Sequence, residues 1–160
     1  MAREYGRYLN RTHRDGDWNA LTTLQHDCYM ALVSSEDVTW AGVLPYSPIR
    51  FASFASDLTE RKVEKAWAEL AERRFLVIDM TTGEILVRTF LRHDNVIAKP
   101  NLTKAFITAY GRVRSRKLRD AIKQELSRLL STEPTLAGWK QIDERLPELF
   151  AELLDERKAS

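Results

Sequence analysis

The sequence contains one cysteine and three histidines, which leaves few side chains for redox or metal chemistry. Cys28 has no second cysteine with which to form a disulfide bond, and its position on an apolar helical stripe predicts a buried, unreactive thiol. The spacing of His13, His26 and His93 matches no zinc-binding pair. We therefore expect neither a metal site nor a cofactor.

Long apolar runs and the motifs of catalysis are also missing. No run approaches the roughly 20 apolar residues that cross a bilayer, and no apolar segment of a signal peptide follows the first residues. The sequence has no nucleophile with a paired base, no metal-ligand pattern and no glycine-rich phosphate loop. These absences predict a cytoplasmic protein that is not an enzyme.

Residues 58–90 carry the clearest structural pattern, a helix followed at once by two strands. Thr59 stands at the expected N-cap of the helix. Residues 75–78 form a short β-prone run, residues 81–83 a turn and residues 84–90 a return strand. The helix is predicted from apolar residues at helical spacing, which are Leu58, Val63, Ala66, Trp67 and Leu70.

Two more helices and a strand are predicted upstream. Residues 21–34 have Thr22 and Gln25 at capping-box spacing. Ser47 followed by Pro48 predicts the start of a short helix, and residues 41–44 form a brief apolar strand. The first helix is expected to bury Leu24, Cys28, Ala31 and Leu32, and the second to bury Ile49, Phe51, Phe54 and Ala55.

The C-terminal part is predicted to be helical. One helix follows Pro100 and is expected to end at Gly111, and a second begins at Ser115 as its N-cap. Residues 131–135 are interpreted as a linker. Beyond them, an apolar helical face interrupted by Pro147 must be covered by the domain, a second copy or another protein.

Together these elements predict an α+β, mostly helical fold class. Its core is a winged helix-turn-helix of three helices and a β-hairpin, with additional C-terminal helices. The predicted division is a winged-helix domain with an entry segment at 1–94, a basic helical extension at 95–131 and an amphipathic helical segment at 132–160.

Three stretches also carry a family resemblance. They are AGVLP at 41–45, LTERKVEKAWAELAERRFLVID at 58–79 and VRTFLRHDNVIAKPN at 87–101. In this order they resemble the N-terminal winged-helix domain of phage replisome organisers and similar DnaD-like replication proteins, over residues 1–130. Tyr5, Tyr8 and Trp18 lie where that family has an aromatic entry segment. The resemblance implies DNA binding or primosome assembly at a replication origin, without catalysis.

The net charge of +2 hides an uneven distribution. Residues 95–123 contain 8 Lys or Arg and 1 Asp, whereas the chain on either side is slightly acidic. Five of these cations, here called the basic cluster, are Arg112, Arg114, Arg116, Lys117 and Arg119. Basic residues at the start of a helix oppose the helix dipole, which favours a phosphate-binding surface over a purely structural role. The alternative is a solvated helix start balanced by the acidic tail.

The leading prediction is a DNA-binding protein that acts in replication initiation of a phage or mobile element. The basic cluster would hold duplex or partly melted DNA. If about five phosphates are neutralised, log K falls with log salt at a slope of about −4 to −5. The predicted recognition helix would contribute Arg61, Lys62 and Lys65.

Two features favour other roles. Glu64, Glu69 and Glu72 share the outer surface of the predicted recognition helix, so that surface fits a solvated face about as well. The hairpin tip, residues 80–84, has no Lys or Arg. The second hypothesis is therefore a protein-interaction or oligomerisation module of a primosome-like or other phage assembly, and the third is a winged-helix transcriptional regulator. Expected partners are DNA, a second copy, or a replication or other phage or host protein, and no membrane.

The entry segment mixes basic and aromatic side chains, which are Arg3, Tyr5, Arg7, Tyr8, Arg11, Arg14 and Trp18. One interpretation is an arm that reaches nucleic acid through phosphate contacts and stacking. The other is that the aromatic residues pack this segment onto the core, which we favour because Tyr and Trp of a small domain are usually buried.

Overall fold

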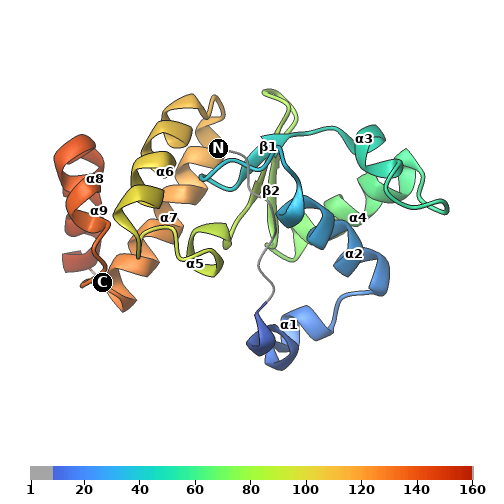
Figure 1. The fold of residues 1–160 in the computed structure, drawn as a ribbon, viewed down its shortest axis with the longest axis horizontal. Helices are drawn as coiled ribbons and strands as arrows, with labels where there is room; N and C mark the ends of the chain where they lie inside the picture. Colours follow the sequence, from blue (N-terminus) through green and yellow to red (C-terminus); the bar gives the residue numbers. More distant parts are fainter. Residues whose placement is uncertain (1–8, 160) are drawn as a thin grey trace.

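The computed structural model describes residues 9–159, without the side chain of Arg11. The described part is α+β and mostly helical, with one three-stranded antiparallel sheet (Figure 1). Its elements are η1 (Asn10–Arg14), α1 (Gly16–Asn19), α2 (Thr23–Ser34), β1 (Val43–Pro45), α3 (Pro48–Ala52), α4 (Glu60–Glu72), β2 (Leu76–Asp79), β3 (Glu84–Val87), α5 (Phe90–His93), α6 (Pro100–Arg112), α7 (Arg116–Thr132), α8 (Trp139–Arg145) and α9 (Pro147–Ala159).

The predicted helix starts are confirmed at α2 and α4. Thr22 and Gln25 form the capping box, each accepting from the backbone N–H of the other. The Thr59 hydroxyl accepts from the backbone N–H of Lys62. The apolar stripe of α4 is buried as predicted, with Val63, Ala66, Trp67 and Leu70 at most 1% exposed.

The hairpin closes a small sheet in which β3 is the central strand. β2 pairs with β3 around Ile78 and Ile85, and β1 pairs with the other edge of β3 around Leu44 and Ile85. The chain order α2, β1, α3, α4, β2, β3 with strand order β1-β3-β2 is compatible with the predicted winged helix. In Figure 1, α2, α3 and α4 lie on one side of the sheet and α6 to α9 on the other.

The return strand is shorter than predicted, because the chain turns into α5 after Val87. The Val87 N–H donates to the Gly42 carbonyl at 2.9 Å, and Phe90 then packs against Gly42. Gly42 has a φ of +76°, and a Cβ there would lie 2.7 Å from the Phe90 Cβ. The end of the strand thus depends on a close approach that only glycine permits.

Several predicted core positions are wrong. Leu24, in the first turn of α2, is 37% exposed, whereas Cys28 and Leu32 of the same predicted stripe are buried. Ile49 and Phe54 are 65% and 54% exposed. The helix α3 has only five residues, so Phe54 lies beyond its end and Phe51 is its main buried aromatic residue.

The C-terminal helices begin as predicted but end differently. Ser115 caps α7 by accepting from the Leu118 N–H at 3.1 Å. The predicted end at Gly111 is wrong, because α6 continues through Arg112. The predicted linker is wrong in its first two residues, since α7 extends to Thr132.

The apolar face of residues 139–159 is covered within the chain, the first of the three alternatives. α8 packs against α6, and α9 packs against α7 and α8. Trp139, Ile142, Leu149 and Leu153 are buried there. No helix in residues 9–159 is long and apolar enough to span a membrane.

Candidate nucleic-acid interface

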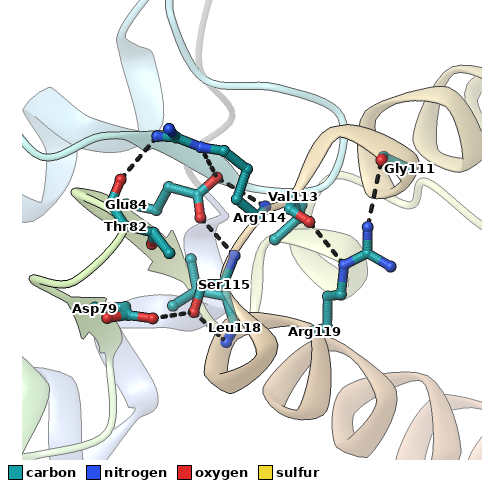
Figure 2. Close-up of polar contacts among 9 residues, drawn as sticks. All are labelled: Asp79, Thr82, Glu84, Gly111, Val113, Arg114, Ser115, Leu118 and Arg119. Atoms are coloured by element: carbon teal, nitrogen blue, oxygen red, sulfur yellow. Dashed lines mark hydrogen bonds and ion pairs between the residues drawn. The ribbon is translucent and has the colours of Figure 1, made fainter.

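The basic cluster lies where α6 ends and α7 begins, and its Arg114 reaches the tip of the β2–β3 hairpin (Figure 2). Val113 and Ser115 have extended backbone angles and are 3% and 1% exposed. The side chains of Arg112 at the end of α6, Arg114 in the extended connection and Arg116 at the start of α7 are exposed. Two buried residues thus alternate with three exposed arginines. This pattern, visible in the letters RVRSR, is the signal that sequence reasoning missed.

Two carboxylates of the hairpin hold this extended stretch in place. Glu84 is 7% exposed, and its carboxylate accepts from the backbone N–H of Arg114 at 3.2 Å and of Ser115 at 2.8 Å. Asp79 accepts from the Ser115 hydroxyl at 2.5 Å, and this bond is the main reason that the pKa of Asp79 is lowered. Neither acid was expected at the site. Both fix the backbone that carries the basic cluster.

Two cations of the basic cluster reach the hairpin directly. The Arg114 guanidinium donates to the Thr82 carbonyl at 2.7 Å, and its Nε lies 3.9 Å from Glu84 Oε1, yet its side chain is 71% exposed. Lys117 donates to the Ile78 carbonyl at 2.8 Å. The hairpin, whose tip has no Lys or Arg of its own, thus receives positive charge from the α6–α7 connection and from α7.

Arg119 differs from the rest of the basic cluster. Its guanidinium donates to the carbonyls of Val113 at 2.7 Å and Gly111 at 3.3 Å and lies 5.2 Å from the centre of the Tyr110 ring. The last carbonyls of a helix have no helical donor, so a cation there completes the end of α6. Arg112 and Arg116, by contrast, have no side-chain hydrogen bond or ion pair with residues that the structure describes.

The predicted contributors of α4 are exposed but partly engaged. Lys62 donates to the Asp57 carbonyl at 2.6 Å, and Lys65 lies 3.9 Å from Glu69. Arg61 makes no side-chain contact of this kind within residues 9–159. Figure 1 places α4 and α7 on opposite sides of the sheet, so the hairpin separates the two basic groups.

The remaining candidates are placed as follows. Tyr5 and Tyr8 lie outside the described residues. Trp18 is 4% exposed and stacks on His26 with ring centres 4.3 Å apart, as the packing interpretation predicts. Cys28 is buried as predicted, and burial raises its pKa to about 11.

Comparison with known proteins adds no family to these observations. No family model, curated protein or solved structure matches the chain. Function must therefore be inferred from the charges and packing of the chain itself, above all from the exposed cations beside the hairpin tip.

Proposed function

We propose that this chain is a winged-helix protein that binds DNA. The order of its helices and strands and the pairing of its sheet support the winged helix. The resemblance to phage replisome organisers suggests replication initiation as the process. The observation that carries the proposal is the exposure of Arg112, Arg114, Arg116 and Lys117 beside the hairpin tip.

These four cations suit a phosphate backbone for a physical reason. Glu84 fixes the backbone at Arg114 and Ser115, and Asp79 holds the Ser115 side chain, before any ligand arrives, so little backbone freedom is lost there on binding. The two carboxylates offset part of the charge, but each is occupied by hydrogen bonds from the chain. Contacts between cations and DNA phosphates do not depend on the base sequence, and the affinity that they provide falls strongly with salt concentration.

The test is a salt titration of duplex binding by fluorescence anisotropy. Because Arg119 is half-buried whereas the other four cations are exposed, we expect about four neutralised phosphates and a slope of log K against log salt near −3.6, rather than the −4 to −5 expected for five. The double variant Arg112→Gln/Arg116→Gln should reduce that slope by about 1.8, since it removes two cations with no structural contact. Binding that hardly changes with salt would contradict the proposal.

A matched control removes two exposed cations elsewhere, with Lys104→Gln on α6 and Arg145→Gln on α8. The net charge of this control equals that of Arg112→Gln/Arg116→Gln. If both variants lose affinity to the same extent, overall charge rather than the basic cluster attracts DNA, and the assignment of the site is wrong.

A second candidate function is a protein-interaction or oligomerisation module. Ile49 and Phe54 favour it, because two large apolar side chains from one short segment are exposed. Analytical ultracentrifugation beside a gel-shift assay separates the two functions. A stable oligomer that does not shift DNA would support the second.

A further inference from the structure

A cavity of ≈ 680 Å³ lies at the open end of the hairpin, where α4 turns into β2 and β3 passes into α5. The basic cluster contacts the hairpin toward its other end, where Arg114 binds the Thr82 carbonyl and Lys117 the Ile78 carbonyl. Cavities of several hundred cubic ångströms are typical of small-ligand sites. Five arginines from separate segments line this one: Arg14, Arg73, Arg74, Arg88 and Arg92.

Three of these arginines are not committed to the fold. Arg88 is committed, because it binds the carboxylate of Glu125 and donates to the Arg74 carbonyl. The side chains of Arg14, Arg73 and Arg74 are exposed and have no hydrogen bond or ion pair with any residue in the described ranges. Unused guanidinium groups on one cavity form a site for an anion with several oxygens.

The backbone at Arg74 supports this assignment independently. Arg74 has a φ of 63°, a left-handed conformation that side chains with a Cβ disfavour. It closes α4, with the Arg74 N–H on the Ala71 carbonyl at 3.0 Å and the Phe75 N–H on the Leu70 carbonyl at 2.9 Å. Glycine is the usual residue at such a helix end. An arginine there is costly for the backbone, and a ligand of its side chain would account for it.

The acids of the cavity narrow the class of ligand. Asp15 is occupied, because it accepts from the backbone N–H groups of Asp17 and Trp18. Asp17 and Glu133 are exposed at the lining, and Asp94, which also lines the cavity, is 6% exposed. They would repel a weakly bound anion, so the ligand must carry more than one charge and make several guanidinium bonds. A terminal phosphate has about two charges at neutral pH and three acceptor oxygens.

We propose that this cavity binds a phosphate monoester or polyphosphate group through Arg14, Arg73 and Arg74. The group belongs either to a free nucleotide or to the 5′ end of a nucleic-acid strand. This second site does not depend on duplex binding by the basic cluster.

Calorimetric titration with pyrophosphate and with ATP tests the proposal. We expect binding to the intact chain and at least a tenfold loss in Arg73→Gln/Arg74→Gln. The control Lys104→Gln/Arg145→Gln carries the same charge change outside the cavity and should bind as the original chain does. Absence of binding, or an equal loss in both variants, overturns the proposal.

A second arm distinguishes the sources of phosphate. Short single strands with and without a 5′ phosphate are compared by anisotropy. A tenfold preference for the phosphorylated strand, lost in Arg73→Gln/Arg74→Gln, supports a strand end. Binding of ATP without that preference supports a free nucleotide. The variant Arg112→Gln/Arg116→Gln should bind pyrophosphate as the original chain does. A failure of the proposed duplex binding can therefore be distinguished from a failure of phosphate binding in the cavity.

The single variant Arg74→Gly separates a binding role from a structural one. Glycine relieves the left-handed backbone, so the melting temperature should rise while pyrophosphate binding weakens. A rise in melting temperature with unchanged binding would show that Arg74 contributes nothing to the site and would overturn its assignment.

Discussion

Replacing Glu84 by glutamine tests how the hairpin holds the start of α7. The carboxylate accepts from the Arg114 N–H at 3.2 Å and from the Ser115 N–H at 2.8 Å, and the residue is 7% exposed. A glutamine has nearly the same shape but only one acceptor oxygen. Its NH₂ group would face one of the two backbone donors, so one hydrogen bond is lost and the other loses its charge.

The expected cost follows from these contacts. A hydrogen bond to a charged group contributes about 1.5–3 kcal/mol, and a neutral one about 0.5–1.5 kcal/mol. Losing one and weakening the other should lower the free energy of unfolding by about 2 kcal/mol. With a urea dependence of about 2 kcal/mol per M, the unfolding midpoint should fall by about 1 M.

Urea unfolding followed by the fluorescence of the four tryptophans measures this midpoint. The control is Glu72→Gln, an exposed residue of α4 without a side-chain contact in the described part of the chain. That variant should stay within about 0.5 kcal/mol of the original chain. If Glu84→Gln shifts the midpoint no more than this control, the hairpin carboxylate does not hold the α6–α7 connection.

Three further outcomes can be measured. Gly42→Ala forces a Cβ to within 2.7 Å of the Phe90 Cβ at a φ of +76°, so calorimetry should show a loss of about 3 kcal/mol, or roughly 10 °C in Tm. The Cys28 pKa of about 11 predicts that the thiol reacts with a disulfide reagent at pH 8 only after unfolding; rapid reaction of the folded chain would contradict its burial. The hydrogen bond from Ser115 lowers the pKa of Asp79 below its ordinary value of 3.8. The ionised carboxylate therefore stabilises the fold at pH values above 3.8, and this stabilisation is lost as the pH falls through the lowered pKa. In Ser115→Ala, NMR titration should give a pKa closer to 3.8, and an unchanged value would contradict the assigned cause.

Rules that relate residues a few positions apart predicted the helix caps and the buried face of α4. The caps at Thr22, Thr59 and Ser115 act over three residues, and all three are confirmed. The cap expected at Ser47 is wrong in one respect, because Ser47 precedes α3 but makes no side-chain cap bond. The buried stripe of α4 follows from helical periodicity alone. These elements could be placed without knowing what they pack against.

The exposed apolar residues show where local rules end. Helical periodicity groups Leu24 and Ile49 with other apolar residues on one face of a helix. It cannot tell which residues of that face meet the core. α3 ends at Ala52, so Phe54 no longer follows the helical repeat. Whether these side chains are buried depends on tertiary packing.

The candidate site was predicted in composition but not in geometry. The basic cluster is exposed at four of its five positions, yet Arg119 completes the end of α6. The bond from Ser115 to Glu84 joins residues 31 positions apart, and no spacing rule connects them. Four of the five cavity arginines lie within residues 73–92, but Asp79 and Glu84 stand between them and Arg14 is far away in the sequence, so charge counting in one stretch could not find the site.

The attachment of the hairpin to α7 has a consequence for any duplex that the chain binds. Glu84, Asp79, Arg114 and Lys117 join the hairpin to the start of the 17-residue α7, and these contacts oppose a movement of the tip toward a wider or narrower groove. Bending a short duplex costs a few kcal/mol and depends on its base sequence. Where protein and duplex differ in shape, the duplex must therefore deform, and easily bent sequences would be preferred even at base pairs that no side chain touches.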